Sequence, residues 1–418
     1  MGGNTKTGFH RPAYSDEESL VMQYFAEQAE ASGLHYRFDS IANLIIETPG
    51  TFDHWIETGS HVDTVPGGGN YDGLAGVVAG FTAIQFIINS GYSLKQGLRL
   101  RIWRGEESAS FGIASIGSRA AFGQLPASCL TMTYRGKNLA TAMTGQHANP
   151  ISIEHGQPVI SPDELESITA YIELHIEQGK VLETQQLDIG IVTAIRGSRR
   201  SWVHLTGTFD HSGATPMGDH YRQDCNLAMA HMHVRLDELL QQSNSTGSDL
   251  VQTIGAINSN QEMNKKFDMN RNAVSKISGR AYFSFEIRGC DAGQVSTYCK
   301  QADNIIKQTA AEFAIDIQIE TFSDQQGVPA LDHAIQQQTC LACDTLNLTH
   351  MSMPSGAWHD AGTVAQQKRQ DGNHIPVGMI FIPCRNGISH SPDEYATPEA
   401  IAAGTSVLAT TMLALANQ

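Results

Sequence analysis

The pattern of hydrophobic and polar positions in the first part of the chain predicts a succession of strands and a helix. Short apolar, β-rich runs cover residues 44–47 and 54–59, and a glycine-dense loop then ends at Gly73. Residues 74–89 have the composition of a buried helix, and residues 98–103 alternate like a strand. A strand, a helix and a strand in this order predict a right-handed crossover in a parallel sheet. Such sheets bind ligands beyond the carboxyl ends of their strands.

Two later segments, residues 171–176 and 377–383, also look like strands that run into polar loops. The chain between them has a different rhythm of strand, helix, strand, strand, helix and strand, at residues 201–209, 224–242, 250–257, 280–288, 292–313 and 315–322. This order is the split β-α-β unit. We therefore expect a ferredoxin-like α+β domain at residues 200–324, inserted into a discontinuous α/β domain of residues 1–199 and 325–418.

Composition and charge narrow the class of protein and of partner. The chain has 418 residues, of which 41% are hydrophobic and 17% are charged, so disordered and fibrous classes are excluded. The formal net charge of -16 argues against nucleic-acid binding, which needs clustered Lys and Arg. Small molecules are the expected partners.

The cysteines and the apolar stretches indicate a cytoplasmic protein without a membrane segment. Seven cysteines are scattered along the chain, as expected for free thiols in a reducing compartment. Cys340 and Cys343 form a C-x-x-C pair, for which a thiol pair buried on a helix is a simpler interpretation than redox or zinc chemistry. The N-terminal residues contain no signal-peptide core. The longest apolar stretch, Leu74 to Ile88, is shorter than a membrane span.

Candidate metal ligands follow the second predicted strand. His61 and Asp72 lie at its carboxyl end, where imidazole nitrogen suits zinc and a carboxylate can bridge two ions. Asp63, two residues after His61, is placed to fix the His61 ring. Taken singly, His61 fits a hydrogen-bonded loop histidine as well as a ligand.

The same edge of the predicted sheet collects further residues of this kind. Glu106, Glu107, His175 and His390 all come just after or at the ends of predicted strands. One of the paired glutamates can bind metal while the other accepts a proton from water. An acidic, solvated turn would explain the two glutamates alone, but it does not explain the histidines. The sequence therefore predicts a metal-dependent hydrolase.

Six strings in the chain are similar to a known group of enzymes: GSHVDTVPGGGNYDG, RGEES, ELHIEQG, HSGATPM, SGAWHDA and GISHSPDE. From about Gly8 to the C-terminus the chain resembles the hydantoinase/carbamoylase branch of the zinc-dependent amidase and carboxypeptidase superfamily. The resemblance implies a phosphorylase/hydrolase-like catalytic domain with a mixed sheet flanked by helices. It also implies that the inserted domain is a lid and dimerisation domain.

The resemblance further implies how the metal-binding residues are divided. His61 and His175 would bind one metal, Glu107 and His390 the other, and Asp72 would bridge both. Each subunit would hold two divalent metal ions, zinc first, with manganese or cobalt as alternatives. Glu106 would be the general base and later the acid, and Asp63 would orient His61.

Residues of the other strings would contact the substrate. His211 would help polarise the scissile carbonyl, reaching in from the neighbouring subunit of a homodimer, and Arg288 would bind the substrate carboxylate. His359 would face the substrate, while Gln178 would contact it or satisfy backbone groups near the metals. Ser275 stands where the family usually has asparagine, unless Asn272 takes over that contact through a local insertion.

The implied reaction is hydrolysis of a linear amide or ureido C–N bond in a small ureido acid. An N-carbamoyl-L-amino acid hydrolase that releases ammonia and carbon dioxide is expected first, with allantoate amidohydrolase as the alternative. A β-ureidopropionase, or a dipeptidase or aminoacylase of the same superfamily, is less favoured, and a non-catalytic binding protein is a remote alternative. Trp358 and Lys180 depart from the family pattern in the expected substrate pocket.

Overall fold

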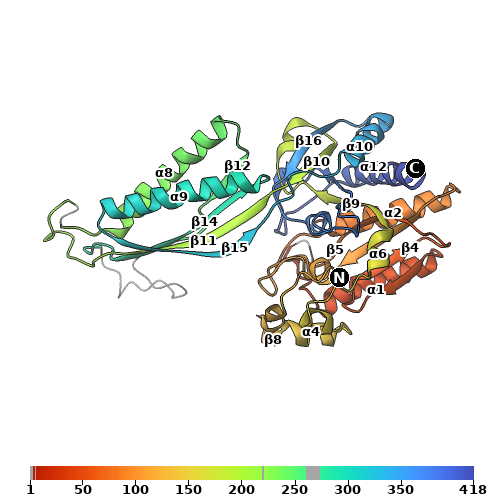
Figure 1. The fold of residues 1–418 in the computed structure, drawn as a ribbon, viewed down its shortest axis with the longest axis horizontal. Coiled ribbons are helices and arrows are strands. Elements are labelled where there is room, and N and C mark those ends of the chain that lie inside the picture. The colour runs from red at the N-terminus through yellow and green to blue at the C-terminus, as the bar shows by residue number, and fades with distance from the viewer. Residues whose placement is uncertain (1–2, 5, 219–220, 260–273) are drawn as a thin grey trace. The chain divides into compact units, whose positions relative to one another are not determined.

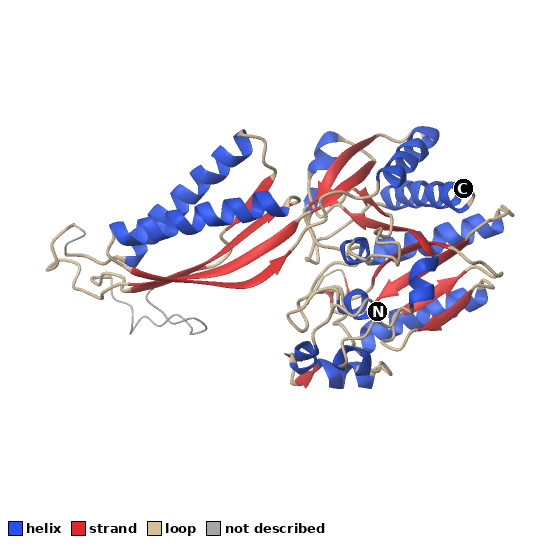
Figure 2. Cartoon of the chain, in the orientation of Figure 1, coloured by secondary structure: helices blue, strands red, loops and turns tan. Residues whose placement is uncertain are grey.

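The computed structural model describes residues 3–4, 6–218, 221–259 and 274–418 (Figures 1 and 2). The chain divides into two compact units: Met1–Ala194 together with Ala330–Gln418, and Ile195–Pro329. The second unit is a single insertion in the first. Its ends lie a few residues outside the predicted insertion, because the first and last strands of its sheet begin and end beyond the predicted limits.

The first unit is built on an eight-stranded sheet with the order β16-β10-β17-β9-β5-β6-β4-β3. Its strands are β3 (His35–Phe38), β4 (Leu44–Glu47), β5 (Trp55–His61), β6 (Gly97–Trp103), β9 (Ile168–Ile176), β10 (Ile189–Ile195), β16 (His350–Ser355) and β17 (Val377–Ile382). The central strands β17, β9, β5 and β6 are mutually parallel, whereas β10, β4 and β3 pair antiparallel with their neighbours. The carboxyl ends of the four parallel strands therefore meet at one edge.

Long helices pack against this sheet and supply most of the core. They are α1 (Asp16–Ala31), α2 (Leu74–Asn89), α10 (His333–Leu346) and α12 (Pro398–Ala416). One hydrophobic cluster joins them to the strands, with Phe25, Ile84, Ile335 and Met412 among its buried members. The strands β6 and β17 are buried along their whole length, as expected for parallel strands covered on both faces.

Local sequence signals set several helix ends. The hydroxyl of Ser15 accepts the N–H of Glu18, whose carboxylate accepts the N–H of Tyr14, so a reciprocal cap begins α1.

Shorter elements complete the unit: β1 (Gly3–Asn4), β2 (Gly8–Phe9), α3 (Ile116–Ala121), η1 (Ala127–Thr131), β7 (Thr133–Tyr134), β8 (Lys137–Asn138), α4 (Leu139–Gly145), α5 (Ile151–Glu154), α6 (Pro162–Ser167), α7 (Val181–Gln185), α11 (Asp360–Ala365) and η2 (Arg385–Gly387).

The second unit is an antiparallel sheet with two long helices. Its strands are β11 (Gly197–Thr206), β12 (Leu250–Thr253), β13 (Ile257–Ser259), β14 (Arg280–Gly289) and β15 (Asp316–Gln325), and its helices are α8 (Cys225–Ser245) and α9 (Ala292–Glu312). The strand order is β12-β14-β11-β15, with β13 also paired to β14. Burial alternates along β14, and the buried side packs on α8 and α9 in a separate core. Its role as a lid or dimerisation domain stays a prediction.

One helix among the described residues, α12, is long and apolar enough to cross a membrane. Its residues Val407, Leu408 and Met412 are fully buried in the core that it shares with α2 and the sheet. Burial therefore explains its apolar composition.

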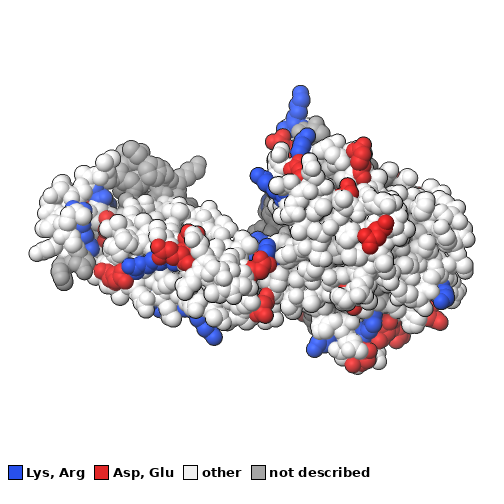
Figure 3. Space-filling view, turned by 90° about the horizontal axis from the view of Figure 1, so that it is seen from above, with Lys and Arg blue, Asp and Glu red and all other residues white. Residues whose placement is uncertain are grey.

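Charged side chains are dispersed on the face drawn in Figure 3. Lys and Arg lie singly or in small groups among Asp, Glu and uncharged residues. The described residues of this face thus form no continuous basic surface of the kind that tracks a phosphate backbone.

The predicted mixed α/β fold, with its sheet flanked by helices, is confirmed.

Candidate metal centre

Four neighbouring parallel strands bring distant residues together at one edge of the sheet. His61 ends β5 and His175 is the last residue but one of β9. Glu107 follows β6, and His390 lies in the loop after β17. Asp72 enters from the glycine-dense loop that precedes α2, so five segments of the chain converge here.

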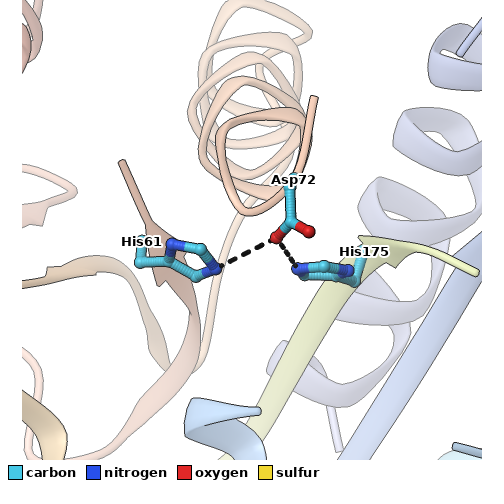
Figure 4. A group of neighbouring side chains, drawn as sticks. All are labelled: His61, Asp72 and His175. Carbon is cyan, nitrogen blue, oxygen red and sulfur yellow. Dashed lines mark ion pairs between the residues drawn. The ribbon is translucent and has the colours of Figure 1, made fainter. Parts of the chain in front are cut away.

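One oxygen of Asp72 faces two histidines (Figure 4). Oδ1 of Asp72 lies 3.4 Å from Nε2 of His61 and 3.1 Å from Nε2 of His175. All three side chains are buried, and their ligand atoms lie within 4.8 Å of one another. Two imidazole nitrogens and a carboxylate oxygen in this arrangement can hold one metal ion.

The other oxygen of Asp72 faces a second group. Nε2 of His390 lies 3.4 Å from Oδ2 of Asp72 and 3.2 Å from Oε1 of Glu107. These three residues also have ligand atoms within 4.8 Å of one another. The two oxygens of Asp72 therefore divide the other four residues into two pairs, the arrangement that a bridging carboxylate requires.

The electrostatics of the two groups fit cations. Burial would raise the pKa of Asp72, but His175, His390 and His61 hold it well below its usual range. Hydrogen bonds with Asp72 and Glu107 raise the pKa of His390 to about 11. Burial would lower the pKa of His61 and of His175, yet the neighbouring carboxylates raise both. Each cluster thus attracts positive charge, which divalent ions would supply in place of protons.

Asp63 ties the His61 loop to the loop after β6. One of its oxygens lies 3.2 Å from Nδ1 of His61. Its two oxygens also accept the backbone N–H groups of Glu106 and Glu107, at 3.0 Å each. With Nδ1 facing a carboxylate, the Nε2 atom of His61 is free to face Asp72.

Glu106 is buried beside the two groups of possible metal ligands. Among the described residues, it belongs to neither group. Its Oε2 lies 3.9 Å from Nε2 of His61, and the hydroxyl of Ser115 lies 3.5 Å from its Oε1. Burial, together with the charge of Glu107, raises the pKa of Glu106 well above its ordinary value. A carboxyl group of this kind can accept and return a proton near neutral pH.

Gln178 and Ser389 complete the surroundings of Asp72. The Gln178 amide and the Ser389 hydroxyl each donate to Oδ2 of Asp72, at 2.6 Å in both cases. Gln178 and His390 both have left-handed backbone conformations, with φ of 55° and 57°. Such conformations are strained in residues other than glycine and cluster at functional sites.

Gly73 makes the approach of His61 to Asp72 possible. Its φ of 63° favours glycine, and a Cβ atom there would lie 2.5 Å from the His61 imidazole. Any larger residue would therefore displace the ring.

His359 lies behind His175 rather than in either group. It is buried, its Nε2 is 2.9 Å from the hydroxyl of Ser355, and its ring packs edge-on against that of His175. Burial lowers the pKa of His359 well below its ordinary value. With Glu173 and His175 it forms a third group whose ligand atoms lie within 4.8 Å of one another.

Two buried carboxyl groups, of Glu173 and Asp360, lie close to His175 and His359. Glu173 accepts the hydroxyl of Ser60 and the N–H of Ala361, and Asp360 accepts the hydroxyl of Ser118. Burial and the neighbouring Glu173 raise the pKa of Asp360 to about 8. Neither residue was among the predicted site residues, although Glu173 precedes His175 by two positions and so shares its strand face.

The remaining predicted site residues belong to the second unit. His211 is exposed, and its Nδ1 accepts the N–H groups of Gly213 and Ala214 at 3.1 Å, which leaves Nε2 to carry the proton. Ser275 is also exposed. It lies close to His211, because the Ser275 carbonyl accepts the backbone N–H of Ser212. Asn272 lies outside the described residues.

Arg288 stands near the end of β14 and forms an ion pair with Glu286 on the same strand. Glu286 also accepts a hydrogen bond from Arg200 at 2.6 Å. Burial would raise the pKa of Glu286, but the two arginines lower it. The guanidinium is thus held in place by a carboxylate.

Lys180 and Trp358, two residues that depart from the family pattern, belong to the first unit. Lys180 is exposed directly before α7, and Trp358 is partly buried against Gly362. Neither belongs to a group of possible metal ligands among the described residues.

The chain is similar to several known hydrolases. The sequence profile of peptidase family M20/M25/M40 matches residues 58–414. The ureidoglycolate hydrolase of Arabidopsis thaliana is 30% identical over 97% of this chain and 82% of its own length. The allantoate amidohydrolase of Escherichia coli is 31% identical, over 100% of this chain and 95% of its own.

Two further proteins are similar over nearly their whole length. The N-carbamoyl-L-amino acid amidohydrolase of Geobacillus stearothermophilus is 31% identical over 100% of this chain and 96% of its own. The crystal structure of an amidase of the hydantoinase/carbamoylase family from Burkholderia multivorans has a TM-score of 0.85 and 27% identity, over 100% of this chain and 95% of that one.

Proposed function

This chain belongs to peptidase family M20/M25/M40, and we propose that it is a metal-dependent amidohydrolase that cleaves a C–N bond of a small ureido acid. The compounds in the names of the three curated relatives share a ureido group, which supports this substrate class. An N-carbamoyl-L-amino acid is the substrate proposed first, and allantoate is the alternative. The relative named for ureidoglycolate adds that compound to those to be tested.

The observation that carries the proposal is the division of ligands by Asp72. His61 and His175 face one of its oxygens, and His390 faces the other together with Glu107. We assign one divalent ion to each group, zinc first and manganese or cobalt as alternatives, because nitrogen and carboxylate donors suit all three. When bound, the two ions would act as Lewis acids that acidify water and polarise the scissile carbonyl.

Glu106 supplies the proton transfers. It lies within the centre but outside both groups, so its carboxylate is available to take a proton from water. It then returns that proton to the leaving nitrogen. For an N-carbamoyl amino acid and one water, the products are the amino acid, ammonia and carbon dioxide. Asp63 holds both His61 and the backbone of Glu106 during these steps.

Substrate contacts are assigned to the second unit and to the rim of the centre. His211 donates from Nε2 to the oxygen that becomes negative, from the neighbouring subunit, because its Nδ1 is already occupied by backbone N–H groups. Arg288 binds the substrate carboxylate as a bidentate fork. Gln178 and His359 are assigned to the substrate as further contacts from the first unit, and Ser275 or Asn272 provides the remaining polar contact.

The test is ammonia release from a panel of substrates. The purified protein is loaded separately with zinc, manganese and cobalt. It is then offered N-carbamoyl-L-amino acids, allantoate, ureidoglycolate, ureidopropionate, a dipeptide and an N-acetyl amino acid, with product amines measured for the last two. Turnover of ureido acids that exceeds peptide or acyl cleavage by at least about 100-fold, roughly 2.7 kcal/mol of transition-state discrimination, supports the assignment. Preference for the dipeptide or the acyl substrate would replace it with a dipeptidase or aminoacylase, and binding without turnover would indicate a non-catalytic binding protein.

We further propose a cytoplasmic homodimer. All seven cysteines are free, as in a reducing compartment. Strand β15 lies at the edge of its sheet, so its outer side can pair with a second copy. A molar mass of one chain in light scattering at micromolar concentration would refute the dimer.

A further inference from the structure

Glu394 is a buried carboxylate that the mechanism above does not use. It lies in the loop between β17 and α12, four residues after His390, and the residue is 4% exposed. It belongs to none of the groups of possible metal ligands among the described residues. A buried carboxylate needs partners that repay its lost hydration.

One oxygen of Glu394 holds the loop before α2. Its Oε1 accepts the backbone N–H of Tyr71 at 2.8 Å and that of Asp72 at 2.9 Å. These two peptide groups set the position from which the Asp72 side chain enters the centre.

The other oxygen holds the loop after β17. Its Oε2 accepts the hydroxyl of Ser389 at 3.1 Å and the backbone N–H of His390 at 3.2 Å. One carboxylate therefore joins two segments that are 322 residues apart along the chain. Because the Ser389 hydroxyl has a single proton, it donates either to Glu394 or, at 2.6 Å, to Oδ2 of Asp72, and it thus lies between the two carboxylates.

The packing around Glu394 leaves its carboxylate little freedom. A Cβ atom at Gly69 would lie 2.2 Å from the carboxyl carbon of Glu394. The glycine-dense loop thus passes directly against this side chain. Movement of either loop would break hydrogen bonds at the same carboxylate.

We propose that Glu394 is a positioning residue that sets the separation of Asp72 and His390 and thereby the affinity of the centre for metal. This inference rests on the proposed function, since it takes Asp72 and His390 as metal ligands. The physical reason is preorganisation: ligands already held at the binding distance lose less conformational freedom when the ion binds.

Glu394→Gln is the most specific substitution at this position. Glutamine has the shape of glutamate, but it offers one acceptor oxygen where glutamate offers two. The amide can therefore satisfy only one pair of donors, and its NH₂ group would face N–H or O–H donors of the other loop. Either Asp72 or His390 loses its backbone anchor.

The experiment measures binding of Zn²⁺ alone, in competition with a chromogenic chelator, by the full-length wild type, Glu394→Gln and Glu399→Gln. Glu399 is an exposed glutamate in the first turn of α12 and serves as the matched control. We expect Glu394→Gln to weaken Zn²⁺ affinity by about 10–100-fold, the usual effect of losing a group that orients a ligand. We expect the control to stay within about twofold.

Two more variants separate positioning from folding. Glu394→Asp keeps both oxygens on a shorter stem and should lose less affinity than Glu394→Gln. Gly69→Ala keeps Glu394 but pushes on its carboxylate, and should also weaken Zn²⁺ binding; both serve if Glu394→Gln does not fold. Wild-type affinity in every folded variant would overturn the inference and leave the proposed function intact. Absence of Zn²⁺ binding by the wild type would overturn both.

Discussion

Asp63 and His61 form a buried pair at the centre of the site, with an Asp63 oxygen 3.2 Å from Nδ1 of the ring. The same carboxylate accepts the backbone N–H groups of Glu106 and Glu107. It therefore fixes a proposed ligand at the end of β5 together with the proposed base and a second proposed ligand in the loop after β6. A change at Asp63 should be felt by both halves of the chemistry.

Replacing Asp63 with asparagine should reduce both metal affinity and turnover. The amide cannot accept from two N–H groups while also facing the imidazole N–H, so the ring and the loop after β6 lose a common anchor. A loss of about 10–100-fold is expected in metal affinity and in kcat. Metal titration and ammonia release, with the exposed Asp53→Asn as control, check this. Values within twofold of the wild type would contradict it.

Gly73→Ala should disturb the centre beyond ordinary backbone strain. Its Cβ would lie 2.5 Å from the His61 ring, whereas Gly91, with a similar positive φ of 73°, has no atom within 4 Å of a built Cβ. Left-handed backbone strain should lower the free energy of unfolding of both alanine variants by about 1–2 kcal/mol. Only Gly73→Ala should also lose metal affinity, as measured by titration. Equal metal affinity in the two variants would show that His61 is not held by this contact.

The convergence of the proposed metal ligands could be predicted from sequence because their placement follows from strand order. His61, Glu107, His175 and His390 each stand at or after the carboxyl end of a parallel strand, and neighbouring strands of one sheet must bring those ends together. The sharing of Asp72 between two groups came from the family resemblance, and spacing along the chain did not give it.

Metal binding should tighten as pH rises. Hydrogen bonds that the carboxylates of Asp72 and Glu107 accept from its ring raise the pKa of His390 to about 11, and the pKa values of His61 and His175 are also raised. His390 therefore carries a proton near pH 7 in the metal-free protein, and the raised pKa values of the other two rings act in the same direction, so a metal must compete with protons for these ligands. Affinity should increase at least about tenfold per pH unit between pH 6 and 8, one unit being 1.36 kcal/mol per proton released. Titrations in a metal buffer check the slope, and a pH-independent affinity would argue against histidine ligation.

Glu394 and Asp360 show what the sequence could not supply. Glu394 stands in the GISHSPDE string, yet its proposed positioning role depends on the loop around Asp72, 322 residues away, and on hydrogen bonds to backbone groups. Asp360 follows His359 directly, but its burial beside Glu173 appears only when α11 packs on β9. Side-chain to backbone contacts between distant loops leave no periodic pattern in a sequence.

The sheet beneath the centre should depend on a buried ion pair. Glu57 and Arg101 are 1% and 0% exposed and form an ion pair, and Arg99 also donates to Glu57 at 3.2 Å. Glu57→Gln leaves Arg101 partly unpaired and should reduce the free energy of unfolding by about 3–5 kcal/mol. Glu47→Gln, at the partly exposed rim of the network, should cost less than about 1 kcal/mol. Denaturant unfolding of the metal-loaded proteins compares them, and equal losses would contradict the account.

The central claim is that two metal ions and Glu106 divide the chemistry between them. The most direct test measures metal content and ammonia release on the same samples of wild type and Glu106→Gln. We predict two ions per chain in both proteins and a kcat about 10²–10⁴-fold lower in the variant, because only the proton carrier is lost. A variant that turns over at the wild-type rate, or a fully active wild type with a single ion per chain, would contradict the account.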